Sequence, residues 1–215
     1  MCRYTYIATA LSLILLTGAG YAQERGAIKL PAPVMTGGMP LMQALKARHS
    51  TREFSGKALS PQVLSNLLWA AAGVNRPDSG KRTAPSARNW REIDIYITLP
   101  EGAYRFDANE HVLLPVRSED LRAQTGVQDF VARAPVNLVY VANLDRMQGA
   151  SSEHQDLYAA ADTGFIAQNV YLFCASEGLA TVVRGSVDRE ALAPMLGLGE
   201  WQRIILAQTV GYPAK

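Results

Sequence analysis

Cysteine is almost absent from this 215-residue sequence, which contains only Cys2 and Cys174. Cys2 lies at the extreme N-terminus, so the chain has no set of cysteines that could form a disulfide framework. Cys174 is flanked by apolar residues within a helical pattern. It is therefore interpreted as a small buried hydrophobic residue, because no basic residue lies near it in the sequence to favour the thiolate.

Histidine is also scarce, and the sequence predicts no metal site. His49, His111 and His154 lack the spacing of metal ligands, and no cysteine cluster supports them. His111 and His154 have polar neighbours and are expected at the surface. The GxSxG and P-loop motifs are absent, and the GLGEW stretch lacks the third glycine of a dinucleotide fingerprint. If the protein is an enzyme, we expect a cofactor to supply the chemistry.

The chain has little excess of either charge. Its formal net charge is +2, from 21 basic and 19 acidic residues. The first 22 residues contain only one of these charges, Arg3, so the rest of the chain carries +1. Such a balance argues against nucleic-acid binding and against a polybasic membrane anchor.

The N-terminus has the pattern of a secretory signal peptide. Arg3 precedes the uncharged run YIATALSLILLTGAG, and small residues precede a cleavage position after Ala22. We therefore interpret residues 1–22 as a signal peptide and predict export to the periplasm, with retention as an anchor left open. Residues 23–39 contain prolines and glycines and are interpreted as an extended arm, either a tether or a wrap around a partner. Residues 40–215 are predicted to form the folded domain.

The remaining pattern predicts an α+β domain with one mixed central β-sheet surrounded by helices. Helices are expected at 61–72, where Ser60 is the N-cap and Gly73 ends the helix, at roughly 118–132, and at 152–177. The last of these is apolar on most of its circumference and rich in small residues, so it is expected to be buried at the centre of a homodimer. Residues 75–91 are interpreted as a long polar loop.

Strands are expected where apolar residues alternate or run together. EIDIYIT alternates and predicts a half-buried strand, whereas the apolar run PVNLVYVAN predicts a central strand covered on both faces. AYRFD and HVLL predict a hairpin, and LATVVRG and RIILAQTVGYP predict the last two strands.

One stretch, Arg48-His49-Ser50-Thr51-Arg52, concentrates basic and hydroxyl side chains in five residues. Arginine offers a planar fork of donors that suits phosphate oxygens. In an extended segment Arg48, Ser50 and Arg52 would share one face, with Phe54 as an apolar anchor. Spacing alone leaves two interpretations open, an anion clamp and a solvated helix end.

The motifs taken together resemble the FMN-dependent nitroreductase family. RHSTREF, LSPQVLSNLLWAAAG, APSARNW, DTGFIAQNVYLFCASEGLAT, VRG and the terminal GYP occur in the family's order over nearly the whole chain from residue 41 to residue 213. The resemblance implies a nitroreductase-like homodimer with FMN at the dimer interface, in a short, exported branch similar to azoline dehydrogenases.

The resemblance also implies a set of cofactor-binding residues. Arg48, His49, Ser50 and Arg52 match contacts to the phosphate and ribityl chain of FMN. Ser86 and Asn89 match a loop that the second subunit brings to the flavin, and Arg184 and Gly185 match the turn whose backbone approaches the flavin ring. Trp90 and Tyr104 are candidates to line the substrate pocket, while the roles of Arg91, Arg184 and Lys215 stay open. No residue is assigned as catalytic, and no metal ligand is expected.

The implied function is an FMN-dependent oxidoreductase that transfers hydride between a reductant and a small nitro, quinone or similar substrate. NAD(P)H is the family's usual reductant, but it is scarce outside the cytoplasm, so an exported enzyme raises the question of its electron donor. Two alternatives remain open: a flavin-dependent dehydrogenase of azoline or peptide type, and a protein that binds flavin without turnover. A buried side chain of Arg184 facing the flavin would stabilise an anionic reduced form.

Overall fold

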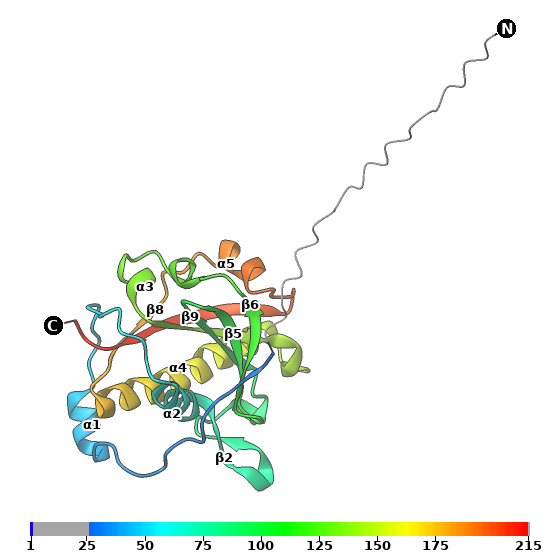
Figure 1. The fold of residues 1–215 in the computed structure, drawn as a ribbon. Helices are drawn as coiled ribbons and strands as arrows, with labels where there is room; N and C mark the ends of the chain where they lie inside the picture. The colour runs from blue at the N-terminus through cyan, green and yellow to red at the C-terminus, as the bar shows by residue number, and fades with distance from the viewer. Residues whose placement is uncertain (2–25, 215) are drawn as a thin grey trace.

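The computed structural model describes Met1 and residues 26–214, and the signal-peptide prediction and Lys215 lie outside these residues. A seven-stranded sheet with the order β1-β6-β5-β4-β7-β9-β8 forms the centre of the domain (Figure 1). The strands are β1 (Ile28–Lys29), β4 (Ile93–Leu99), β5 (Gly102–Asp107), β6 (Val112–Arg117), β7 (Val136–Asn143), β8 (Ala180–Arg184) and β9 (Gln202–Gly211). The helices are α1 (Leu41–Ala47), α2 (Pro61–Ala72), α3 (Phe130–Arg133), α4 (Ser152–Glu177) and α5 (Arg189–Met195).

Every pair of neighbouring strands in this sheet is antiparallel, so the prediction of a mixed sheet was wrong. Short turns join β4 to β5 and β5 to β6, and a short turn forces antiparallel pairing. The crossover through α4 does make β7 and β8 run in the same direction. However, β9 lies between them and runs oppositely to both, so no parallel pair forms.

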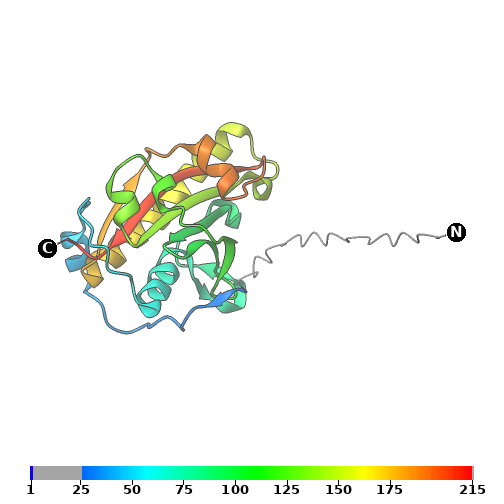
Figure 2. The same cartoon turned by 45° about the horizontal axis from the view of Figure 1, so that its top comes forward.

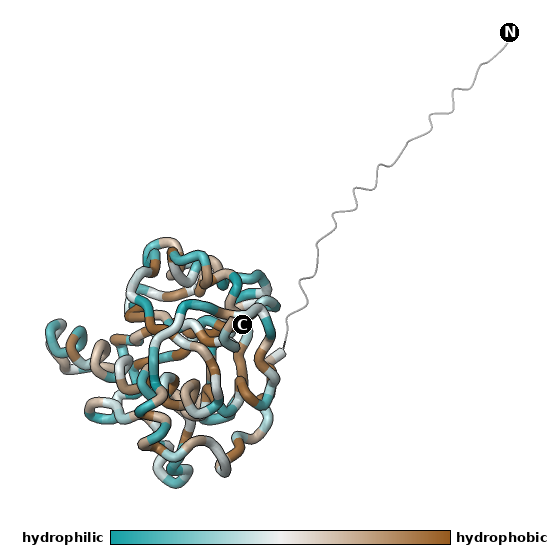
Figure 3. The backbone as a smooth tube through the Cα atoms, turned by 90° about the vertical axis from the view of Figure 1, so that its left-hand side faces the viewer, coloured by the Kyte–Doolittle hydropathy of each residue, from teal (hydrophilic) through white to brown (hydrophobic). Residues whose placement is uncertain are grey.

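Helices cover both faces of the sheet (Figure 2). Helices α2 and α4 pack on the face that carries Ile93, Ile95 and Ile97, and α5 packs with Tyr96 on the other. Strand β4 is therefore buried on both faces, and its prediction as a half-buried strand was wrong. The apolar run 136–142 is confirmed as a central strand covered on both faces. Hydrophobic residues concentrate in the middle of the chain trace and hydrophilic ones in its outer turns (Figure 3).

The two long helices begin and end as their sequences predict. Ser60 accepts a hydrogen bond from the Val63 N–H at 3.3 Å, and Ser151 accepts one from the His154 N–H at 3.4 Å. Helix α4 ends at Gly178, which has a φ of 65° and donates its N–H to the Cys174 carbonyl. Cys174 itself is fully buried, as expected, and burial raises the pKa of its thiol well above the usual range.

Two segments differ from their predictions: residues 75–91 are more ordered than predicted, and residues 118–132 are less helical. The predicted loop 75–91 contains a two-stranded sheet of β2 (Val74–Arg76) and β3 (Lys81–Arg82), with 3-10 turns η1 (Pro77–Ser79) and η2 (Ala87–Asn89). The predicted helix over 118–132 is only the 3-10 turn η3 (Arg122–Thr125) followed by the single turn α3. A further 3-10 turn, η4 (Leu144–Met147), follows β7.

The described part of the arm packs on its own chain. Its strand β1 pairs with β6, and its Val34 and Met39 N–H groups donate to Asn66 Oδ1 at 2.9 Å and to Ser176 Oγ at 2.7 Å. Asn66 and Ser176 lie on α2 and α4. In the described part of the chain, no helix combines the length and apolar character needed to cross a membrane.

Candidate functional site

The RHSTR segment lies along the free edge of β8. Helix α1 ends at Arg48, whose N–H donates to the Ala44 carbonyl at 2.8 Å. The chain then becomes extended, and the Thr51 N–H donates to the Thr181 carbonyl of β8 at 3.0 Å. Phe54 is buried and packs its ring 5.4 Å from that of Phe130, which confirms it as an apolar anchor.

Tyr171 of α4 connects this segment to β8. Its hydroxyl accepts a hydrogen bond from the Val183 N–H at 3.0 Å and lies 2.7 Å from Ser50 Oγ. The guanidinium carbon of Arg48 lies 5.3 Å from the centre of the Tyr171 ring, a cation–π distance. Arg48 and Ser50 thus contact the same side chain, as their alternation in an extended segment predicts. Sequence reasoning placed Tyr171 only in the apolar face of the helix and missed this contact.

The arginines of the segment have donors available for an anion. Arg52 and His49 are exposed and Arg48 is half-buried. Neither Arg48 nor Arg52 forms an ion pair with a carboxylate among the described residues. His49 Nδ1 lies 2.7 Å from the Ala47 carbonyl, which leaves the other ring nitrogen outward. Two neighbouring arginines that form no ion pair with a carboxylate of the described residues are a suitable contact for phosphate.

Gly185 extends the same edge, but the Arg184 side chain turns away from it. Gly185 is exposed, and a Cβ there would meet only the Leu206 side chain, at 3.9 Å, so a flat ring could approach its backbone. Arg184 is instead 4% exposed, with Nε 3.0 Å from Thr209 Oγ1 and Nη2 3.2 Å from Asn137 Oδ1. Its Nη1 donates to the Thr125 carbonyl at 2.7 Å, and burial lowers the pKa of the guanidinium to about 10.

The hypothesis that the Arg184 side chain faces a flavin is therefore wrong. That hypothesis, that the cation stabilises a reduced flavin or attracts an anionic substrate, required the side chain to point toward the cofactor, and it points into the interior of the sheet instead. Tyr104, a second candidate for the pocket wall, is 2% exposed and packs in the core. Trp90 is half-buried and makes an edge-on contact with the Tyr158 ring at 5.8 Å.

The loop that carries Ser86 and Asn89 has an unusual backbone. Arg88, Asn89 and Arg91 have φ values of 49°, 58° and 51°, a region that costs L-residues on the order of 1 kcal/mol each. Ser86 stabilises the loop internally, because its Oγ accepts the Arg91 N–H at 2.8 Å and donates to Glu92 Oε2 at 3.1 Å. Asn89 is exposed at the tip. Clustered backbone strain of this kind is typical of functional loops.

Two buried carboxyl groups, which sequence reasoning missed, lie under this loop. Glu92 is fully buried and Asp162 is 3% exposed, and both line a cavity of about 20 Å³. Asp162 Oδ2 accepts the Ala87 N–H at 2.8 Å. Burial, reinforced by the neighbouring Asp162, raises the pKa of the Glu92 carboxyl to about 7. The only sequence signal was Asp162, an acid that lies among the alanines and other apolar residues in the middle of the helix.

Two smaller expectations concern histidine and metals. His111 was expected at the surface, but it is half-buried, with Nε2 2.7 Å from Ser65 Oγ, so that prediction was wrong. Burial lowers the pKa of its imidazole. Among the residues that the structure describes, no group of three or more histidine, cysteine, aspartate or glutamate side chains could hold a metal ion.

The predicted site residues fall into two groups that one chain keeps apart. The first group, Arg48 to Arg52 and Gly185, lies along β8 at the edge of the sheet. The second, Ser86 and Asn89, precedes β4, three strand positions away. Strand pairing places Thr181 of β8 level with Val136 of β7, and it places Ile93 of β4 level with Ala142 of β7. Val136 and Ala142 are six residues apart along β7. With strands about 4.8 Å apart and a rise of about 3.4 Å per residue, Thr181, which the RHSTR segment contacts, is separated from Ile93 by more than about 20 Å. Arg184 pairs with Ala207, which is level with Val139, so the Gly185 end of the first group lies closer to β4 than Thr181 does.

Comparison with known proteins identifies the family. The family model described as "Nitroreductase family" matches residues 45–212. The chain belongs to the nitroreductase family. It is 49% identical to a "putative nitroreductase" from Ralstonia eutropha JMP134, with a TM-score of 0.85 over 90% of this chain and 92% of that one. "Putative nitroreductase MJ1384" from Methanocaldococcus jannaschii is 29% identical over 176 residues, covering 77% of this chain and 88% of that protein.

Membership makes the chain a nitroreductase-family oxidoreductase, in a family that typically binds FMN and is generally homodimeric. A crystal structure of a "putative nitroreductase" in complex with FMN from Desulfovibrio desulfuricans has a TM-score of 0.60 and 20% identity, covering 82% of this chain and 88% of that one. At that identity the likeness concerns the fold alone. The α+β nitroreductase-like fold with its long helix is thus confirmed.

Proposed function

We propose that two copies of this chain form a homodimer with two equivalent FMN sites, each built from both subunits. One chain supplies the β8 edge, with Arg48, His49, Ser50, Arg52 and the backbone at Arg184 and Gly185. The other supplies Ser86 and Asn89. The observation that carries the proposal is that Thr181, which the RHSTR segment contacts, lies more than about 20 Å from Ile93, which follows the loop with Ser86 and Asn89, within one chain.

The surface of the subunit supports the proposed dimer. Two helices expose large apolar side chains, namely Leu41, Met42 and Leu45 on α1 and Leu157 and Phe165 on α4. Leu41, Met42, Leu157 and Phe165 are each 47–76% exposed. Extended apolar patches of this kind mark interaction surfaces, and helix α4 is the one that the sequence placed at a dimer centre.

The residues of the proposed site have distinct tasks. Arg48 and Arg52 would neutralise the phosphate of FMN, and Ser50, held by Tyr171, would donate to it or to the ribityl chain. Gly185 would allow the ring to approach the backbone because it has no Cβ. Asn89 can both donate and accept hydrogen bonds at a flavin edge. When bound, FMN supplies the hydride transfer between a reductant and a small nitro, quinone or similar acceptor.

An absorbance spectrum of purified residues 23–215, before and after addition of FMN, tests this proposal. We expect bound flavin in the wild type and at least tenfold weaker binding in both Arg48→Ala and Arg52→Ala, because each loses a charge-assisted contact to phosphate. Arg203→Ala, which removes an exposed arginine paired with Asp156, is the matched control and should bind normally. A wild type that binds no flavin at excess FMN would contradict the proposal. Binding without turnover of any donor would support the non-catalytic alternative.

We also propose that residues 1–22 direct export to the periplasm and that a donor other than NAD(P)H then reduces the flavin. The support is the apolar run after Arg3 and the small residues before Ala22. Fractionation of expressing cells, with mass spectrometry of the N-terminus, tests this. A mature chain that begins at Gln23 in the periplasmic fraction is the expected result. An intact N-terminus in the cytoplasm would contradict it and restore NAD(P)H as the donor.

A further inference from the structure

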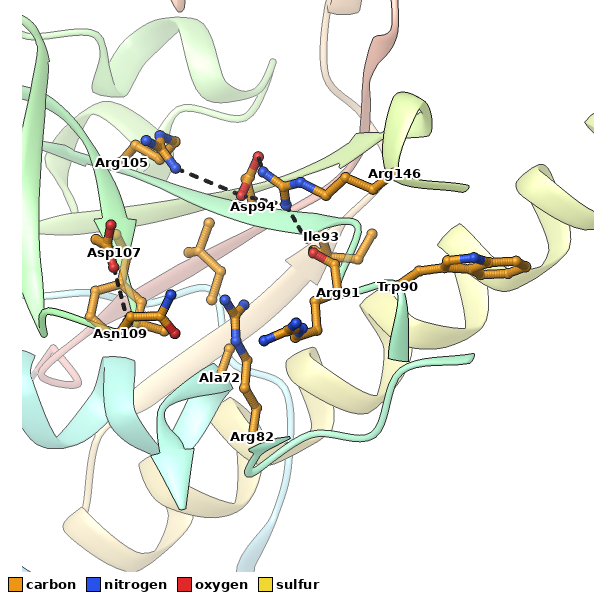
Figure 4. A pocket seen from close by; sticks show the side chains of 13 residues that line it. Ala72, Arg82, Trp90, Arg91, Ile93, Asp94, Arg105, Asp107, Asn109 and Arg146 are labelled. Atoms are coloured by element: carbon orange, nitrogen blue, oxygen red, sulfur yellow. Dashed lines mark hydrogen bonds and ion pairs between the residues drawn. The ribbon is translucent and has the colours of Figure 1, made fainter. Parts of the chain in front are cut away.

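A cavity of about 270 Å³ is lined by residues of β4 and β5, which lie away from the β8 edge in the strand order, and Figure 4 shows its side chains. Its walls come from β3, from the end of the loop that carries Asn89, from β4 and β5, and from the turn between β5 and β6. The volume lies slightly below the range of roughly 300–1,000 Å³ that is usual for ligand pockets. None of the residues of the proposed FMN site lines this cavity, although Trp90 and Arg91 in its wall directly follow Asn89 in the chain.

The polar wall of this cavity is strongly basic. Four arginines line it, Arg82, Arg91, Arg105 and Arg146, against two acids, Asp94 and Asp107. The formal charge of these side chains is therefore +2. Both acids already make contacts within the protein, and neither forms an ion pair with Arg82 or Arg91.

Asp94 is held by two of the four arginines. Arg146 binds it through two contacts, Nη1 to Oδ1 at 3.0 Å and Nη2 to Oδ2 at 2.9 Å. Arg105 Nη1 lies 3.9 Å from Asp94 Oδ1. Asp107 Oδ1 instead accepts the N–H groups of Asn109 and Glu110 at 2.9 and 3.1 Å and so closes the turn.

Arg82 and Arg91 have no carboxylate between them. Their guanidinium groups lie next to each other in Figure 4, and the charge of Arg91 acts on Arg82. Neither forms an ion pair with any carboxylate in the part of the chain that the structure describes. Arg82 Nε is buried without a hydrogen-bond partner among these residues. Burial, and next the charge of Arg91, lowers the pKa of Arg82, and the charges of Asp94 and Asp107 offset only part of this effect.

The position of Arg91 is fixed from several sides. Its carbonyl accepts from Arg146 Nη1 at 2.8 Å, its N–H donates to Ser86 Oγ at 2.8 Å, and its Nη1 lies 3.4 Å from the Gly80 carbonyl. The backbone keeps a φ of 51° here despite its cost. Two neighbouring guanidinium groups that form no ion pair with a carboxylate of the described residues form a preorganised receptor for an oxyanion.

We propose that this cavity binds a small ligand through a phosphate or carboxylate group, with Arg82 and Arg91 as its principal contacts. Guanidinium forks match the oxygens of both groups. Ile93 and Phe106 in the same wall provide an apolar surface for a small organic body attached to the anion. The ligand neutralises the two arginines that the protein itself leaves unpaired.

Calorimetric titration of the purified protein, in low-salt buffer with and without saturating FMN, tests the proposal. Inorganic phosphate and succinate are the two probes, which distinguish a phosphate ligand from a carboxylate one. We expect saturable one-site binding of at least one probe in both conditions. Arg82→Gln and Arg91→Gln should each weaken it at least tenfold, since each removes charge-assisted hydrogen bonds. Arg203→Gln, which alters an exposed arginine outside the cavity, should bind as the wild type does.

The melting temperature without added anion distinguishes a binding site from a structural cluster. If Arg82 serves an absent ligand, Arg82→Gln should melt at the wild-type temperature or above it, because repulsion from Arg91 is removed. A lower melting temperature would mean that Arg82 stabilises the fold itself and would overturn the proposal. The absence of saturable binding of both probes would also overturn it, as would equal weakening in Arg203→Gln.

Discussion

At the scale of single residues, the Glu92 carboxyl makes stability depend on pH. Its pKa is raised to about 7 in the folded protein from the ordinary value of 4.5, so the folded state keeps a proton that the unfolded state has already lost. The free energy of unfolding should therefore fall as pH rises from about 4.5 to about 7, by on the order of 3 kcal/mol. Above this pH range, the stabilisation that comes from the protonated Glu92 carboxyl is lost completely.

Glu92→Gln should remove this dependence, because the amide needs no proton to remain neutral. Urea unfolding at pH 5, 6, 7 and 8 measures it. We expect the variant to be more stable than the wild type at pH 8 and closer to it at pH 5. Glu153→Gln, which changes an exposed acid in the first turn of α4, is the control and should follow the wild type. Equal pH profiles for wild type and Glu92→Gln would contradict this reading of the buried pair.

Arg184 provides a second test at this scale. Arg184→Ala leaves the Thr125 carbonyl, Asn137 Oδ1 and Thr209 Oγ1 without their buried donor. We expect a loss of about 3 kcal/mol in the free energy of unfolding by urea. Arg203→Ala breaks only an exposed ion pair and should change stability by less than about 0.5 kcal/mol. A stable Arg184→Ala protein with an altered flavin potential would instead restore the idea that this side chain faces the cofactor.

The sequence could not reveal the environment of Arg184. Its partners Thr125, Asn137 and Thr209 come from three separate segments, and only the pairing of β7, β8 and β9 brings them together. In contrast, local spacing was sufficient for Arg48 and Ser50, since alternation in an extended segment predicts that they share a face. The sequence did not predict that Arg82 and Arg91 lie close together. Residues 75–91 were interpreted as a loop, whereas this segment contains β2 and β3.

At the scale of elements, the C-terminal end of α4 depends on a left-handed residue. Gly178 has a φ of 65°, which a residue with a Cβ adopts only at a cost. We expect Gly178→Ala to lower the free energy of unfolding by about 1 kcal/mol, measured by urea denaturation. Gly178→Asn should cost less, because asparagine tolerates this conformation better. If both substitutions had equal effects, the cap would not depend on backbone conformation.

The elements were predictable where local signals agree. Ser60, Ser151 and Gly178 mark helix ends through hydrogen bonds that involve near neighbours in the chain, and the sequence located both long helices. The direction of strand pairing was not predictable, because it depends on β9 lying between β7 and β8. The sequence pattern of residues 118–132 wrongly predicted a continuous helix. Only the single helical turn α3 packs against the core there.

At the scale of the whole molecule, the proposed FMN site divides into two halves that come from different parts of one chain. Arg48 and Arg52 lie at the β8 edge of the sheet. Ser86 and Asn89 lie in the loop before β4, which is three strand positions away from β8. The strain at Arg88, Asn89 and Arg91 is then understandable, because a rigid loop tip can present Asn89 to a neighbouring subunit. The proposed function depends on this division of the FMN site between two chains.

Flavin binding by mixed dimers tests this claim most directly. Arg48→Ala and Asn89→Ala chains, each expected to bind FMN weakly alone, are co-expressed in equal amounts and the mixture is titrated with FMN. Random pairing makes half of the dimers mixed, and in these one site has both half-sites intact and the other has neither. The account predicts recovery of about a quarter of the wild-type tight sites. A mixture that binds no more tightly than the two variants measured separately would show that both groups serve one chain, and it would contradict the account.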